Sequence, residues 1–248
     1  MLNQNHTSNR FIDSPERMVE TVRRFGIIPL FRSAVPGWSI EDMTAPGCWF
    51  DEGDTLGPWD WKVDVVAEGD IAYGKFLGGK AAFATIPLYR ELMIWRRSLP
   101  KYRAALGEGK PDTLGQLSAT ALKALREAGV MESKDLRKIC GVKKNVMDSI
   151  MQFLQMGTWA VIGDIQRVYR GPDLHYSGWQ TAMHTTPDSI FGDDSPAPAD
   201  APFWVKLMEQ DSAPKQPQLT PAEAREHLIS HIQGFFPDAS RTTLERII

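Results

Sequence analysis

The sequence predicts an α+β protein built on a winged helix-turn-helix, with a small antiparallel sheet and C-terminal helices. Two short helical patterns are separated by Gly141, and strand-like patterns follow them over residues 159–185. Two more strand-like runs flank the pair Gly78-Gly79. We expect four regions: an N-terminal α+β region with a Trp-rich antiparallel sheet (14–104), the winged helix-turn-helix (113–192), a Pro-rich linker (193–219) and a C-terminal helical hairpin (220–248).

Bulk composition excludes several classes of protein. The chain has 248 residues, a net charge of −3 and two cysteines, so neither a disulfide framework nor a wholly basic nucleic-acid coat is expected. No run approaches the roughly 18 apolar residues of a membrane span, and the N-terminus lacks the apolar core of a signal peptide. His175 and His184 lack metal-ligand spacing. We therefore expect a cytoplasmic protein with no metal and no cofactor.

The N-terminal region begins with a helix and continues as a sheet. Ser14, Pro15 and an acid open the helix, and Gly26 ends it. Trp59 and Trp61 alternate with polar residues, a period of two that predicts a strand continuing through residue 66. Residues 71–77 and 81–86 add two more strands.

Acidic side chains near these tryptophans allow two interpretations. Glu52 or Asp54 beside aromatic rings could activate water or stabilise a sugar cation, and a flipped base could stack on Trp59, Trp61 or Tyr73. Alternatively, the acids belong to the solvated face and loops of a sheet, because their spacing singles out no pair. The same residue types are compatible with a pocket and with a plain core.

Residues 87–104 predict a helix whose exposed face is basic. Arg96 and Arg97 lie among aromatic residues, a combination that fits a phosphate-contacting flank with stacking rings. A solvated helix explains the pattern equally well.

The predicted winged helix-turn-helix begins with a helix capped by Thr113, and Ser133 caps its second helix. Its third helix would enter the major groove with Lys143, Lys144 and Asn145 leading. Residues 134–147 hold five bases, Lys138 among them, against one acid, which reverses the charge of the whole chain. Winged helices also mediate protein contacts, so both interpretations stay open.

The last segments are a wing, a linker and two helices. Arg167 and Arg170 on the wing hairpin are placed to follow the DNA backbone. Helices over 222–235 and from Ser240 onward would pack on the body or form a homo-oligomer. No internal repeat is evident in the sequence.

Three stretches resemble the AlkZ-like winged-helix DNA glycosylases: GIIPLFRSAVPGW, the run from WDWKVDVV to LYRELMIWRR, and LRKICGVKKNVMDSIMQFLQMGTWAVIGD. The resemblance covers roughly residues 14–192. It implies winged-helix architecture on a concave face that binds duplex DNA, and excision of alkylated or crosslinked bases without a metal.

One departure separates this chain from that family. The family's catalytic Q-x-Q or Q-x-D motif aligns with GIIPLF, which puts Pro29 and Phe31 where two polar residues should stand. Neither side chain can position a water molecule. Three functions follow as alternatives: a DNA-binding protein without demonstrated catalysis, a DNA glycosylase (a hydrolase) that uses the acids of residues 51–54, or a protein-interaction module that binds no nucleic acid.

Overall fold

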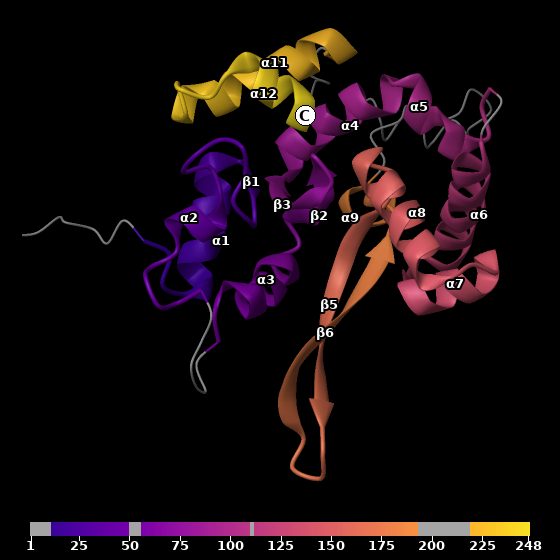
Figure 1. Ribbon diagram of the computed structural model, residues 1–248, viewed down its shortest axis with the longest axis horizontal. Coiled ribbons are helices and arrows are strands. Elements are labelled where there is room, and N and C mark those ends of the chain that lie inside the picture. Colours follow the sequence, from indigo (N-terminus) through magenta and orange to yellow (C-terminus); the bar gives the residue numbers. More distant parts are fainter. Residues whose placement is uncertain (1–10, 50–55, 110–111, 193–218) are drawn as a thin grey trace, which may run out of the picture.

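Six strands form one antiparallel sheet in the order β1-β3-β2-β5-β6-β4. The computed structural model of the chain describes residues 11–49, 56–109, 112–192 and 219–248 (Figure 1). Helices cover the sheet and continue beyond it, which confirms the α+β class.

The first half of the chain contributes three helices and three strands: α1 (Pro15–Phe25), β1 (Ile27–Pro29), α2 (Ile40–Met43), α3 (Pro58–Ala67), β2 (Ile71–Leu77) and β3 (Lys80–Thr85). The helices α4 (Ile86–Ser98) and α5 (Pro100–Arg103) and the 3-10 turn η1 (Ala104–Leu106) lead onward. The second half contains α6 (Thr113–Ala128), β4 (Val130–Glu132), α7 (Ser133–Cys140), α8 (Lys144–Met156), β5 (Val161–Arg170) and β6 (His175–Thr185). The chain ends with α9 (Pro187–Phe191), α11 (Pro221–Phe235) and α12 (Arg241–Ile247).

The second half has the element order of a winged helix-turn-helix, and its pairing is compatible with that fold. The short strand β4 pairs with β6, and β6 pairs with β5. The hairpin of β5 and β6 stands in the position of the wing of such a fold and is called the wing below. It projects from the body on the side opposite to α11 and α12 (Figure 1).

The first half repeats this order, which the sequence did not reveal. It runs helix, strand, two helices and a hairpin, and β1 pairs with β3 as β4 pairs with β6. The two halves meet where Tyr73 of β2 faces Ile162 of β5, so the strand order is mirrored across that junction. The third helix of each half packs on the other half, α3 on β5 and α8 on β2.

The prediction of a strand over residues 59–66 was wrong, because these residues form α3. Gly57 precedes the helix and Pro58 occupies its first turn, where a fixed φ and a missing N–H cost nothing. Trp61, Val65 and Val66 are buried at helical spacing. The predicted Trp-rich sheet is therefore an antiparallel sheet beside a Trp-bearing helix.

Three predicted boundaries also differ. Asp112 caps α6 in place of Thr113, and Glu132 precedes α7, so Ser133 is the first helical residue and not its cap. The helix predicted over 87–104 is divided at Pro100 into α4 and α5.

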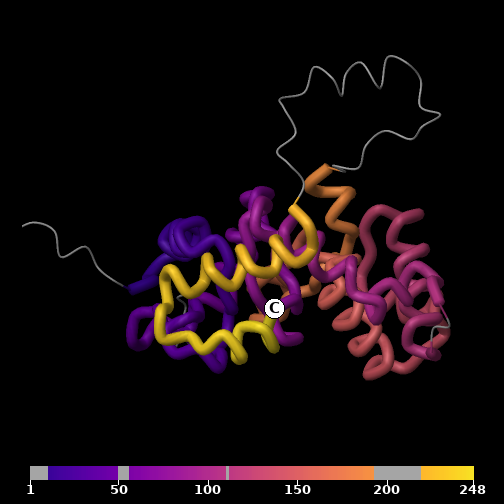
Figure 2. Tube along the Cα trace, turned by 90° about the horizontal axis from the view of Figure 1, so that it is seen from above, coloured from indigo at the N-terminus to yellow at the C-terminus, as the bar shows by residue number. Residues whose placement is uncertain are grey.

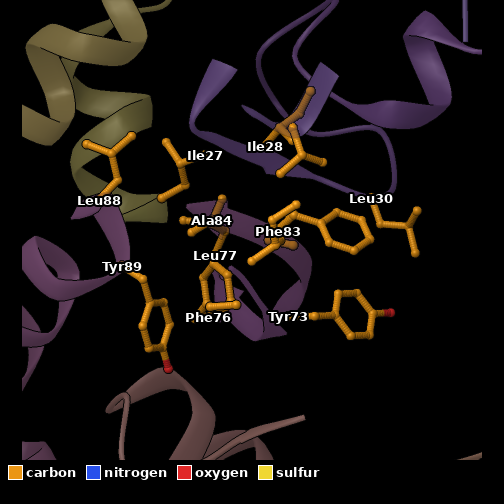
Figure 3. Packing of buried hydrophobic residues seen from close by; sticks show 14 of the residues in the cluster. Ile27, Ile28, Leu30, Tyr73, Phe76, Leu77, Phe83, Ala84, Leu88 and Tyr89 are labelled. Atoms are coloured by element: carbon orange, nitrogen blue, oxygen red, sulfur yellow. The ribbon is translucent and has the colours of Figure 1, made fainter. Parts of the chain in front are cut away.

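Two apolar clusters hold the molecule together. The larger one joins the first half, β5 and the C-terminal helices, and it contains the side chains shown in Figure 3. The smaller one lies between α6, α7 and α8. The predicted C-terminal helices are confirmed as α11 and α12, drawn in yellow in Figure 2. Helix α11 buries Leu228, Ile229 and Ile232 and packs on α4.

Candidate nucleic-acid interface

The start of α8 presents three polar side chains to solvent. Gly141 takes the left-handed conformation that ends α7, and Lys143 then begins the next helix without a side-chain cap. Lys143, Lys144 and Asn145 are all exposed. The first-turn amides of α8 lie beside them, and the positive end of the helix dipole adds to their charge. This surface is suited to an anion.

The neighbouring bases differ in how far they are paired. Lys138 contacts Asp135 at 2.8 Å, and Lys134 contacts Glu132 at the same distance. Such exposed pairs contribute little and can exchange one partner for another. Within the described ranges, no acid pairs with Lys143. The same holds for Lys144, so two exposed lysines without an acidic partner among the described residues lie at the leading end of α8.

The wing carries exposed apolar and basic side chains. Arg170 pairs in register with His175 at the last ladder position before the turn, and both are exposed. Leu174 in the turn is 69% exposed, and Trp179 on β6 is 67% exposed. A hairpin with apolar side chains left in solvent has surface available for a partner.

Three arginines predicted to contact DNA are engaged inside the protein. Arg167 bonds Asp64 at 3.0 Å and faces α3. Arg96 is buried and donates to the Tyr102 hydroxyl at 2.9 Å. Arg97 lies over the ring of Trp159 at 4.5 Å. These side chains tie elements to one another in this conformation.

Of the three aromatic residues predicted to stack on a base, Trp59 alone keeps an exposed ring, 43% accessible. Its ring lies under the Lys62 ammonium, 3.4 Å from the ring centroid. Trp61 and Tyr73 are buried, and Tyr73 stacks on Phe83. Of these three residues, Trp59 is thus the one whose ring a base could reach.

The predicted catalytic acids, Glu52 and Asp54, lie outside the described residues. The two positions aligned with the family's polar motif are described. Pro29 is buried in β1, and the Phe31 ring contacts Trp49 and Trp59, with centroids 5.8 and 6.4 Å away. Phe31 is therefore part of an aromatic cluster, and neither its ring nor Pro29 offers a group that could activate water.

A polar cluster between α3 and the wing was missed by sequence reasoning. Lys62 is only 4% exposed, and its ammonium donates to the Trp59 carbonyl and to Gln180 of β6. Burial lowers the pKa of Lys62, Asp60 opposes this effect and the nearby positive charge of Arg167 adds to it, so that the pKa is about 7. No sequence pattern marks a lysine as buried when its partner lies 118 positions away.

The same cluster engages Asp60 and Tyr176. The Tyr176 hydroxyl donates to the Asp60 carboxylate, and the Gln180 amide donates to it at 3.0 Å. Burial and the carboxylate raise the pKa of Tyr176 to about 12. The wing hairpin and α3 are thus joined by hydrogen bonds and by the Arg167–Asp64 ion pair.

His184 on β6 is buried where the sheet meets α7. Its Nε2 lies 2.8 Å from the Ser133 hydroxyl, and its Nδ1 has no partner among the described residues. Burial, assisted by the charge of Lys75, lowers the pKa of His184 to about 4, so the ring is neutral. The part of the chain that the structure describes contains no group of three or more metal-ligating side chains.

The described helices include none with the length and apolar character needed to cross a membrane. Comparison with curated proteins and with solved structures found no match. A family model described as "AlkZ related" matches residues 12–248, nearly the whole chain and more than the stretch on which the resemblance was noted. The protein therefore belongs to the AlkZ-related family.

Proposed function

We propose that the protein binds duplex DNA through the start of α8 and the wing. The observation that carries this proposal is the set of free polar side chains at the first turn of α8: Lys143, Lys144 and Asn145. In a helix-turn-helix protein, the first residues of this helix meet phosphates and base edges in the major groove. The wing, with exposed Arg170, would follow the backbone beside it.

The charge distribution favours a local contact and not a general coat. The chain carries −3 overall, so attraction to DNA must come from a few cations at this surface. Lys143, Lys144, Arg170 and Lys138 could each neutralise one phosphate. Four such contacts give a slope of roughly −3.6 in log K against log salt concentration, at about 0.9 per contact.

Catalysis by the family's own motif is not part of this proposal. Pro29 and Phe31 supply no polar group. A glycosylase would need an acid from elsewhere, and Glu52 and Asp54 are the candidates from the sequence. A DNA-binding role also agrees with the cytoplasmic location expected from the sequence.

The test is fluorescence anisotropy with undamaged and N7-alkylated duplexes across a salt series. The double variant Lys143→Ala/Lys144→Ala should weaken binding to both duplexes and lower the salt slope by about two. Lys123→Ala on exposed α6 is the matched control and should change neither.

Three other results would redirect the proposal. A DNA affinity that changes neither with salt concentration nor in the double variant refutes it. Preference for the alkylated duplex with release of the base makes the protein a glycosylase, and Glu52→Gln and Asp54→Asn would then be examined. No binding at low salt favours a protein-interaction module.

A further inference from the structure

The wing is attached to the first half of the molecule by a small set of polar side chains. Three of them come from α3: Asp60, Lys62 and Asp64. Three come from the wing: Arg167 on β5 and its register partner Gln180 on β6, and Tyr176 of β6, one ladder position from the last pair before the turn. We call these six residues the latch.

The latch is placed where it can set the direction of the wing. The hairpin leaves the body near Ile165, which is buried, whereas the tip residue Leu174 is 69% exposed. Within the described ranges, the side-chain hydrogen bonds and ion pairs that connect β5 or β6 to α3 all belong to the latch. Breaking these bonds would leave the outer hairpin held by its own ladder alone.

Lys62 makes the latch sensitive to protons. The two groups that accept from its Nζ, the Trp59 carbonyl and Gln180, are both neutral. Asp60 and the Trp59 ring favour the charged form of Lys62, but among the described residues no carboxylate forms an ion pair with its ammonium, and the bonds of Asp60 go to Tyr176 and Gln180. A proton on Lys62 therefore adds a buried positive charge near Arg167 whose desolvation these neighbours offset only in part.

We propose that the six residues form a proton-sensitive latch that fixes the wing against α3 and that opens more often as Lys62 becomes protonated. The proposal rests on the proposed function in one respect, because the fixed wing is the one that would contact DNA. In the closed latch, α3 is the element that holds the wing in its orientation.

The direction of the pH effect follows from the two states of Lys62. In the closed latch its pKa is about 7, and in an open, hydrated latch it returns toward 10.5. The equilibrium constant for opening therefore rises as the pH falls from 10.5 to 7, by at most about tenfold per pH unit. Below pH 7 it levels off. The charges of Asp60 and Arg167 already contribute to the pKa of Lys62. Tyr176, the other titratable group of the latch on β6, stays protonated over this range because its pKa is about 12.

Hydrogen–deuterium exchange of the full chain tests the latch. Protection factors, corrected for intrinsic exchange, would be compared for residues 165–182 and for α4 as an internal reference at pH 8.5 and 7.0. We expect wing protection to fall about tenfold between these values while α4 does not change, since the limit from the two pKa values is roughly 16-fold.

Variants separate the strength of the latch from its response to protons. Lys62→Met keeps the apolar stem and should abolish the pH response of the wing, whereas Lys123→Met on α6 should leave it intact. Asp64→Asn removes the Arg167 pair and should lower wing protection at both pH values without changing the response.

Two results would overturn the proposal. In the first, the protection of the wing changes with pH no more than that of α4. In the second, the wing of Lys62→Met still responds to pH. Should Lys62→Met not fold, the wild-type series and Asp64→Asn still decide. A protein that fails to bind DNA but shows the response would refute the proposed function and leave the latch standing.

Discussion

The buried imidazole of His184 predicts how the stability of the protein depends on pH. In the fold the ring is 5% exposed, accepts or donates one bond with Ser133, and leaves Nδ1 unpartnered within the described structure. Protonation would place a charge there with no acceptor at Nδ1. We predict that His184→Phe, which keeps a ring of similar shape, removes part of the acid sensitivity of the protein.

The magnitude follows from the two protonation equilibria. The pKa of His184 is about 4 in the fold, against 6.5 for an ordinary histidine, so protons favour the unfolded chain. The stability that the neutral, buried ring contributes is fully present above pH 6.5. It decreases as the pH falls from 6.5 to 4 and is lost below 4. At about 1.4 kcal/mol per unit of pKa difference, this contribution to the free energy of unfolding is about 3 kcal/mol in all. About 2 kcal/mol of it is lost by pH 5.

Urea unfolding at pH 7, 6 and 5, followed by tryptophan fluorescence, measures this effect as the difference between wild type and variant. The difference should shift by about 2 kcal/mol in favour of His184→Phe between pH 7 and pH 5. His175→Phe, on the exposed turn of the wing, is the control and should show no such shift. A wild-type-minus-variant difference that stays constant from pH 7 to pH 5 would refute the assignment of a buried neutral ring.

Three further substitutions should destabilise the protein in urea unfolding at pH 7. Arg96→Met removes donors from the Tyr102 hydroxyl and from the Ile247 carbonyl, each 2.9 Å away, and should cost about 2 kcal/mol; unchanged stability would mean that water replaces the guanidinium. Asp112→Ala removes the cap of α6 and should cost about 1 kcal/mol, whereas Asp112→Asn should restore most of it. Gly79→Ala puts a side chain at φ +74° and against Gln152, so about 1–2 kcal/mol should be lost; no loss would show that the turn relaxes.

Local signals predicted the elements well wherever one short stretch determines the conformation. Ser14 accepts a bond from the Arg17 amide at the start of α1, and Gly26 ends that helix at φ +70°. Gly78 and Gly79 both have positive φ and form the turn between β2 and β3. These features depend on residues within four positions of one another, so the sequence contains all the information they need.

The strand predicted at Trp59 failed because a period of two does not by itself define a strand. Trp59 and Trp61 alternate with polar residues, yet Trp59 is half-exposed, and Lys62 between the apolar positions is buried. Pro58 was the stronger signal, since its ring is favoured in the first turn of a helix. The burial of Lys62 depends on Gln180, and no local pattern contains that partner.

Because a local pattern does not contain distant partners, it indicates exposure for only some of the predicted site residues. Lys143 and Lys144 lie at a helix start, and their exposure follows from the local pattern around them. Arg167 and Arg96 carry the same charge, but the Asp64 partner of Arg167 lies 103 positions away, and one of the partners of Arg96, the Ile247 carbonyl, lies 151 positions away. Sequence reasoning can find a base, but only the tertiary fold tells whether that base faces an acid, a carbonyl or the solvent.

The mirrored sheet gives the two halves different tasks although their element orders agree. The strands β2 and β5 meet at one paired position, so the junction depends on each third helix packing on the opposite half. On α8, Gln155 accepts from the Lys75 amide at 2.6 Å near the end of the helix, which leaves its basic first turn free. On α3, Asp60 and Lys62 in the first two turns are themselves the contact with the wing. One half therefore leaves the start of its third helix exposed, and the other uses the start of its third helix to contact the wing.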